Sequence, residues 1–307
     1  MTRYSRVLAG FAYILIAFLY VCPVHAGIPG NRTVEQAYPG LASGILKKAK
    51  MVDMKKGTLV LSEGIEIRDS RFKEAMEQAE PEVREGLRKN LFFFLEQETR
   101  NAVLRKEAFA SGVDTKGLSD SEVIQAYLNK KFRDVQVSDG EAEAFYEANK
   151  AMVGTLPFEQ VKEAIKQVLV REKRQDALVS YLQGLGGKRD IRINREWVRA
   201  QHVFAKDNPV DRARMSGRPT MVEFGAEGCG PCDMMKPILD RLQKKYSDRL
   251  NVVFVHVRKD RVLGARFNIQ SIPVQVFYDK KGREVFRHMG FYPEGEVLKQ
   301  LVKIGVE

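Results

Sequence analysis

Apolar residues recur at helical spacing over the first two thirds of the chain. Between residues 65 and 187 they fall three and four positions apart, which places them on one face of a helix that packs against a core. The first such group is Phe72, Ala75, Met76 and Ala79. A long helix is then predicted from about Pro81 to Ser111, because Gly112 follows it as a C-terminal cap. This part of the chain is therefore predicted to be mostly helical.

Capping signals mark the starts of three later helices. Ser119 with Glu122, and Ser138 with Glu141, are Ser-x-x-Glu capping boxes, in which each side chain satisfies a free backbone N–H of the other residue. The last long helix is predicted to begin near Pro157, because a proline in the first turn costs no hydrogen bond. A Gly-Leu-Gly-Gly run is expected to end that helix.

Short strands replace the helical period after residue 195. The expected strands cover residues 219–224, 252–257, 274–278 and 284–288, and the expected helices cover residues 232–246 and 294–304. The second of these strands is continuously apolar, as strands covered on both faces are. A strand–helix–strand unit followed by a hairpin and a helix predicts an α/β domain of about 100 residues.

The first 26 residues have the pattern of a secretory signal peptide. Arg3 and Arg6 precede an uncharged apolar run over residues 7–21, and Val24-His25-Ala26 supplies the small residues of a cleavage site. The run has 15 residues, shorter than the ~20 that a membrane-spanning helix needs. We therefore expect cleavage after Ala26 and a periplasmic or secreted location, with an uncleaved N-terminal anchor as the alternative.

Length and composition indicate a two-domain globular chain. At roughly 100–200 residues per domain, 307 residues predict two domains, and 44% hydrophobic with 30% charged residues excludes a wholly disordered chain. We expect an α+β two-domain chain, with a mostly α-helical N-terminal domain followed by an α/β domain. The expected segments are a signal peptide (1–26), an extended lead-in (27–50), the helical domain (51–194), a linker (195–214) and the α/β domain (215–307).

Removal of the signal peptide changes the charge and the cysteine count. The full chain carries a net charge of +11, and the loss of Arg3 and Arg6 leaves +9. Nucleic acid is not expected as a partner, because the protein is expected to be exported. Cys22 is also lost, so the mature chain keeps only Cys229 and Cys232, which can form one local disulfide.

The run Cys229-Gly230-Pro231-Cys232 stands at the start of a predicted helix, where dithiol chemistry is favoured. The free N–H groups and partial positive charge of a helix N-terminus stabilise a thiolate. Cys229 would attack a substrate disulfide, and Cys232 would resolve the mixed disulfide. Zinc sites use the same spacing, but zinc needs two more ligands and the mature chain offers only three histidines. We expect a redox-active pair, with no metal and no cofactor.

The segment GAEGCGPCDMMKPILDRLQKKY, residues 225–246, resembles the active-site segment of thioredoxins, including the proline at position 237. Ser271-Ile272-Pro273 matches the loop that carries the family's cis-proline. The resemblance covers about residues 215–304 and implies a thioredoxin fold. It also implies that Pro273 lies against the disulfide, and that Ile272, Pro273, Gly230 and Pro231 contact substrate.

Glu223 falls where thioredoxins carry a buried acid behind the second cysteine. Burial would raise its pKa toward neutrality and let the carboxylate take the Cys232 proton, so we include Glu223 among the catalytic residues. The alternative is an exposed glutamate at a strand end. The sequence departs from the family at three places, namely Gly228 for a tryptophan, Phe254 for a lysine and Arg258 for an aspartate.

Residues 137–150, 157–185 and 190–198 resemble the helical chaperone region of SurA-type foldases. In that family a parvulin proline-isomerase domain is normally inserted before the last helix. Only residues 151–156 stand at that point here, so no prolyl isomerase activity is expected. The alternative is a generic helical bundle used for dimerisation or spacing.

Together these features predict an exported thiol-disulfide oxidoreductase that reduces or isomerises disulfides in client proteins bound by the helical domain. The Cys-Gly-Pro-Cys sequence resembles reducing members of the thioredoxin family, so oxidation is the less favoured direction. A reductase in an oxidising compartment needs electrons, which implies a membrane thiol reductant as a partner. The alternative is a non-catalytic chaperone or assembly factor whose thioredoxin-like domain docks a partner.

Overall fold

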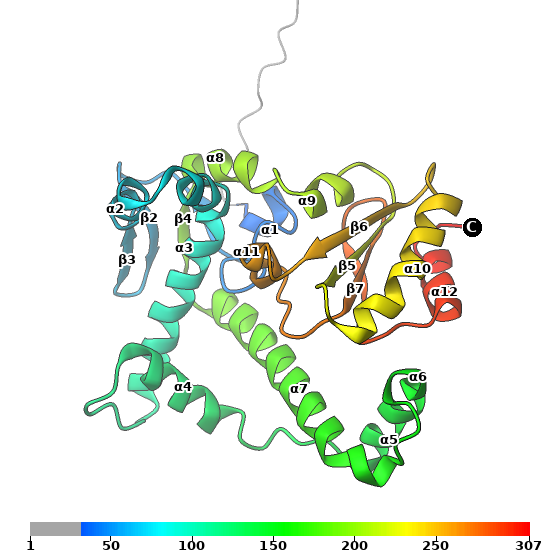
Figure 1. The fold of residues 1–307 in the computed structure, drawn as a ribbon. Helices are drawn as coiled ribbons and strands as arrows, with labels where there is room; N and C mark the ends of the chain where they lie inside the picture. Colours follow the sequence, from blue (N-terminus) through cyan, green and yellow to red (C-terminus); the bar gives the residue numbers. More distant parts are fainter. Residues whose placement is uncertain (1–31) are drawn as a thin grey trace, which may run out of the picture.

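The computed structural model describes residues 32–307, so the predicted signal peptide lies outside the described residues. The described chain forms two domains, in agreement with the predicted α+β organisation (Figure 1). Among residues 32–307, no helix combines the length and apolar character needed to cross a membrane.

The N-terminal domain contains a four-stranded sheet that the sequence analysis missed. Its strands are β1 (Lys50–Val52), β2 (Thr58–Ser62), β3 (Ile65–Arg68) and β4 (Arg192–Asn194), in the order β1-β4-β2-β3. β4 pairs parallel with β1 and antiparallel with β2. The domain is mostly helical as predicted, but the prediction did not include these short strands, which meet from distant parts of the sequence at the two ends of residues 51–194.

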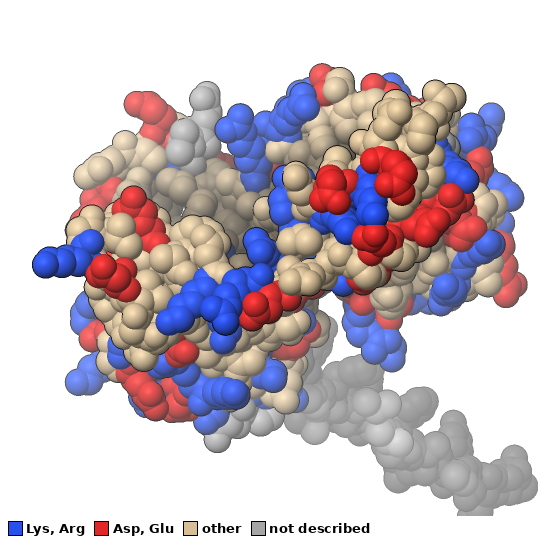
Figure 2. Space-filling model, turned by 90° about the horizontal axis from the view of Figure 1, so that it is seen from below, with Lys and Arg blue, Asp and Glu red and all other residues tan. Residues whose placement is uncertain are grey.

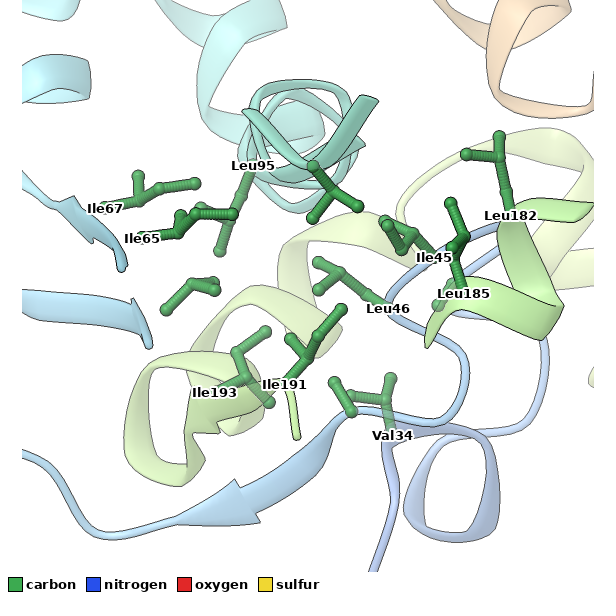
Figure 3. Packing of buried hydrophobic residues seen from close by; sticks show 14 of the residues in the cluster. Val34, Ile45, Leu46, Ile65, Ile67, Leu95, Leu182, Leu185, Ile191 and Ile193 are labelled. Atoms are coloured by element: carbon green, nitrogen blue, oxygen red, sulfur yellow. The ribbon is translucent and has the colours of Figure 1, made fainter. Parts of the chain in front are cut away.

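Helices form the rest of this domain. They are α1 (Val34–Ala37), α2 (Ser70–Gln78), α3 (Pro81–Ala110), α4 (Asp120–Lys131), α5 (Asp139–Ala148), α6 (Lys150–Val153) and α7 (Phe158–Lys188). Both predicted capping boxes are present, at the starts of α4 and α5. The core beneath α3 collects side chains from the sheet, the end of α7 and the segment before β1 (Figure 3).

Residues 32–50 are folded, in contrast to the predicted extended lead-in. Val34, Ile45 and Leu46 are buried in the core of the N-terminal domain. The buried carboxylate of Glu96 on α3 accepts hydrogen bonds from three backbone N–H groups of this segment, those of Ser43, Gly44 and Leu46, at 2.9 to 3.1 Å. These bonds fix the segment because an unsatisfied buried carboxylate would be costly.

Helix α7 continues through the glycines that were expected to end it. Gly186 lies so close to the Ile45 carbonyl that a Cβ atom there would collide with the backbone. The glycine therefore permits close packing of α7 on the 41–49 segment, and the helix ends only at Lys188. A glycine run can serve contact as well as termination, and only the tertiary structure distinguishes the two.

The outer part of α7 forms an arm together with α5. A small separate cluster holds the tip, with Val137, Ala142 and Ile165 buried in it. Lys162 and Lys166 on α7 both pair with Asp139 at the start of α5. Figure 2 shows basic and acidic side chains interspersed over the underside of the molecule, which carries this arm. The tip is thus held by few apolar contacts and several exposed ion pairs.

The C-terminal domain is built on a second four-stranded sheet, in the order β6-β5-β7-β8. Its strands are β5 (Thr220–Gly225), β6 (Asn251–His256), β7 (Val274–Tyr278) and β8 (Glu284–Met289). β5 pairs parallel with β6 and antiparallel with β7. Helices α10 (Gly230–Lys245) and α12 (Glu294–Lys303) cover one face, while α9 (Pro209–Arg214) and α11 (Arg261–Arg266) cover the other.

Residues 195–214 form two packed helices, in place of the predicted linker. Helix α8 (Arg195–Ala205) buries Val198 in the N-terminal core, and α9 buries Val210 against the second sheet. The helical spacing of apolar residues in this segment is hard to recognise, because the change from helical to strand periodicity near residue 195 indicates a domain boundary. Each helix therefore belongs to a different core.

A buried ion cluster joins the two domains. Asp211 is fully buried and pairs with Arg214 at 2.5 Å and with Arg266 at 2.7 Å. The Arg214 guanidinium donates to the carbonyl of Gly40 in the N-terminal domain and to that of Gly282 in the C-terminal domain. Asp211 thereby orients an arginine that hydrogen-bonds both domains at once.

Replacing Asp211 by asparagine is expected to destabilise the protein by about 3 kcal/mol, because two buried guanidinium groups then lose their counter-charge. Equilibrium urea denaturation measures the loss. The matched control is Asp207→Asn, which removes an exposed acid paired with Lys89 and Arg212 and should leave the midpoint nearly unchanged. Equal shifts in the two variants would contradict a specific role for the Asp211 cluster.

Candidate active site

Cys229 and Cys232 form a disulfide at the start of α10. The S–S distance is 2.17 Å and the two Cα atoms lie 5.2 Å apart. Cys229 is the N-cap residue of the helix, and its Sγ accepts a hydrogen bond from the Cys232 backbone N–H at 3.4 Å. Cys229 is half-buried and Cys232 is 6% exposed. This difference in exposure suits Cys229 to first attack and Cys232 to the resolving step.

The environment of Cys229 favours its thiolate once the disulfide is reduced. The first residues of α10 offer unpaired backbone N–H groups and the positive end of the helix dipole. Pro231 stands within the first turn, where the absence of an N–H removes no hydrogen bond. Gly230 is exposed and Pro231 is half-buried beside the sulfur atoms, so the rim next to Cys229 is small.

The loop before β7 approaches the disulfide from the other side. The Ile272–Pro273 peptide bond is cis, in agreement with the expectation from the sequence. The Ile272 carbonyl oxygen lies 4.0 Å from Cys229 Sγ. Pro273 is buried and Ile272 is half-buried. The structure therefore places the predicted substrate-contacting residues Gly230, Pro231, Ile272 and Pro273 around one sulfur atom.

Glu223 lies in the middle of β5 and is fully buried, so the alternative of an exposed strand-end glutamate was wrong. Burial raises the pKa of Glu223 to about 8, because the charged form loses its hydration. Gln275 on β7 donates a hydrogen bond from Nε2 to Glu223 Oε2 at 2.8 Å. Gln275 was not among the residues predicted for the site, although a glutamine inside the apolar run Val274–Tyr278 is a visible signal.

Phe254, which takes the place of a lysine in the thioredoxin pattern, stands beside Glu223. The two residues face each other in the β5–β6 register. The Phe254 ring covers Gly225, where a Cβ atom would approach it to 2.9 Å, and the same Cβ would lie 3.5 Å from the Cys232 Cβ. An aromatic ring therefore lies over Gly225 at the register position beside Glu223, and it supplies no charge to the carboxyl group.

The remaining departures and histidines lie at the edge of the site or outside it. Gly228 is exposed with a φ of +71°, a backbone conformation that favours glycine. The Arg258 guanidinium donates to the Glu227 carbonyl oxygen. His256 accepts a hydrogen bond from the Glu227 backbone N–H. Over residues 32–307, no group of three or more His, Cys, Asp or Glu side chains is arranged to hold a metal ion.

Comparison with known proteins places these features in a family context. The protein-family model described as Thioredoxin matches residues 202–303. A thioredoxin from Alicyclobacillus acidocaldarius subsp. acidocaldarius is 31% identical over 98 residues, which cover 32% of this chain and 92% of that relative. The chloroplastic thioredoxin-like protein HCF164 from Oryza sativa subsp. japonica is 29% identical over 134 residues, covering 43% of this chain and 51% of that relative.

A solved structure was also compared with this chain. Thioredoxin NaTrxh from Nicotiana alata is 28% identical and covers 31% of this chain and 79% of its own, with a TM-score of 0.28. The resemblance of the N-terminal domain to SurA-type foldases stays a prediction.

Proposed function

The chain belongs to the thioredoxin family, and from this premise we propose that it exchanges disulfides with client proteins through Cys229 and Cys232. The observation that carries the proposal is the disulfide itself, which caps α10 and faces a cis-proline loop. One of its sulfur atoms is accessible and the other is buried, as two-step exchange requires.

The proposed reaction begins with the reduced pair. The Cys229 thiolate attacks one sulfur of a client disulfide, and the other client sulfur leaves as a thiolate and takes a proton. Cys232 gives its proton to the Glu223 carboxylate and attacks Cys229 Sγ, which releases the first client sulfur to be protonated in turn. Two electrons have then passed from the dithiol to the client, and the Cys229–Cys232 disulfide remains.

An electron donor must reverse the last step. We propose a membrane thiol reductant, one thiolate of which attacks Cys229 Sγ and displaces Cys232 as a thiolate. The donor's second thiol then attacks the mixed disulfide, which releases Cys229 and leaves the donor oxidised to a disulfide. Glu223 is buried and largely protonated at neutral pH, and we propose that it returns the proton to Cys232. The export signal in the sequence and the Cys-Gly-Pro-Cys run support a reductase or isomerase in the periplasm.

The N-terminal domain is proposed to hold unfolded clients near Cys229. Gln175 on the α7 arm donates a hydrogen bond to Asn268 Oδ1 at 2.6 Å, and Asn268 lies four residues before Ile272. In Figure 1 the cysteine-bearing end of α10 is directed toward the side of the molecule where α5 and α7 lie. A chain held along the arm would therefore be close to the cis-proline loop.

The reduction potential of the Cys229–Cys232 pair tests the proposed direction. Purified mature protein is equilibrated in glutathione or dithiothreitol buffers, and the alkylated thiols are counted by mass spectrometry. We expect a value near −270 mV, the thioredoxin end of the range, whereas −120 to −180 mV would place the protein with oxidants and isomerases. A pair that never closes in any buffer would overturn the dithiol mechanism.

A further inference from the structure

Gln275 is a fully buried polar side chain in the middle of an otherwise apolar strand. Its neighbours on β7 are Val274 and Val276, both buried in the core against α9 and α11. Burying an amide costs free energy unless its hydrogen bonds are satisfied. A leucine or valine would fill the strand without that cost, so the amide must be explained by what it contacts.

The amide hydrogen-bonds Glu223 and no other side chain among the described residues. Glu223 and Gln275 are direct partners in the antiparallel β5–β7 register, so their side chains leave the sheet on the same face. The Gln275 Nε2 group donates to Glu223 Oε2 at 2.8 Å. Glu223 Oε1 and Gln275 Oε1 are both buried and have no hydrogen-bond partner in the described part of the chain.

Protonation of Glu223 would let these two unsatisfied oxygens form a hydrogen bond with each other. While Glu223 is ionised, both are acceptors and neither can satisfy the other. Once Glu223 is protonated, its hydroxyl group is a donor, and the Gln275 carbonyl oxygen is the acceptor held next to it. The amide can therefore serve the carboxyl group in both protonation states, as a donor to the carboxylate and as an acceptor for the acid.

We propose that Gln275 is the positioning residue for Glu223, and that its amide hydrogen-bonds the carboxyl group before and after each proton transfer with Cys232. This inference rests on the proposed function, in which Glu223 exchanges a proton with Cys232. An apolar residue at position 275 would leave the carboxylate without a donor at the moment when Cys232 needs a base.

Charged groups around Glu223 do not take over this role. Burial raises its pKa and the Gln275 hydrogen bond lowers it, with no charged neighbour contributing. Titratable groups on the surrounding elements include Cys232 on α10, His256 on β6 and the exposed Glu296–Lys299 pair on α12. Behind the sheet they include Tyr278 and Asp211 with its two arginine partners. Phe254 occupies the register position beside Glu223 on β6.

The expected result follows from the loss of the one hydrogen-bond donor that the carboxylate has within residues 32–307. In Gln275→Met, which keeps the side-chain length, the pKa of Glu223 should rise by roughly one unit, which is a tenfold change in the ionised fraction at a given pH. Gln275→Asn retains a shorter amide and should give a smaller rise. Gln300→Met is the matched control, because Gln300 is a buried glutamine of the same domain that donates to Tyr292 instead.

Two measurements keep this proposal separate from the proposed function. Carbon-13 NMR of the glutamate side-chain carboxyl carbons in the oxidised full-length protein reports the Glu223 titration without any redox step. An unchanged midpoint in folded Gln275→Met or Gln275→Asn overturns the positioning role. The second measurement is the pH dependence of disulfide reduction by dithiothreitol. A Glu223 midpoint that moves while this pH profile stays fixed would support the pairing and contradict proton transfer to Cys232.

Discussion

Replacing Cys229 by serine should reduce the turnover of a disulfide substrate to the rate of the reductant alone. Exchange begins with a thiolate, and a serine hydroxyl neither ionises near neutral pH nor forms a bond that can be exchanged. Cys232 cannot replace it as the first attacker, because only 6% of Cys232 is exposed. Reduction of insulin by dithiothreitol, followed by turbidity, measures the loss.

Replacing Cys232 by serine should have a different outcome that identifies the clients. Cys229 can still attack, but the mixed disulfide has no resolving thiol, so covalent complexes should accumulate. Non-reducing gels and mass spectrometry detect them, and the Cys229→Ser variant is the matched control that forms none. Full reductase activity in Cys229→Ser would contradict the mechanism.

The double Cys→Ser variant separates the oxidoreductase from the chaperone alternative. If the protein acts on disulfides, this variant loses the reduction of client disulfides, even where it still suppresses client aggregation. If the thioredoxin-like domain only docks a partner, the variant should behave as the wild type in every assay of client folding. Client refolding that depends on native disulfides is therefore the informative assay.

The helices were predictable because their signals are local. Ser119 with Glu122 and Ser138 with Glu141 begin helices as expected, since a capping box needs only residues three positions apart. The N-terminal sheet was not predictable in this way. Its strands β1 and β4 have three residues each and pair from opposite ends of the domain, so no period of two can be recognised in either strand.

The same distinction applies to the active site. The cysteines, Pro273 and Glu223 could be selected from short motifs and from a resemblance that keeps their order along the chain. Gln275 could not be selected, because its role depends on the register that sets it opposite Glu223. A polar residue within a continuously apolar strand is a weak signal alone, and it gains meaning only when its partner across the sheet is known.

Phe254 departs from the thioredoxin pattern, and the structure shows how this residue affects Glu223. From the sequence, the substitution for lysine implied only that one charge near the buried acid is missing. In the structure the ring also stands at the register position beside Glu223 and covers Gly225. An uncharged ring thus stands where a cation would stabilise the carboxylate, and the missing cation disfavours an ionised Glu223.

The buried carboxyl group should make stability depend on pH. The pKa of Glu223 is about 8 in the folded protein and has an ordinary value of 4.5 when exposed. Between these values the unfolded chain is ionised while the folded chain keeps its proton, so unfolding releases a proton. The contribution to stability is complete below pH 4.5 and is lost as pH rises through 8, at about 1.4 kcal/mol per pH unit and about 5 kcal/mol in total.

Glu223→Gln should remove this dependence and stabilise the C-terminal domain above pH 8. A glutamine at this position stays neutral and can still pair with the Gln275 amide, so the buried hydrogen bond is kept while the cost of ionisation disappears. Urea denaturation at pH 5, 7 and 9 measures the stability of each variant. Hydrogen exchange in peptides covering residues 220–225 and 274–278 reports separately on the strands that carry Glu223 and Gln275. Glu294→Gln is the control, because this acid is partly exposed and paired with Arg241. A wild-type pH slope that persists unchanged in Glu223→Gln would show that the raised pKa of Glu223 is not its source.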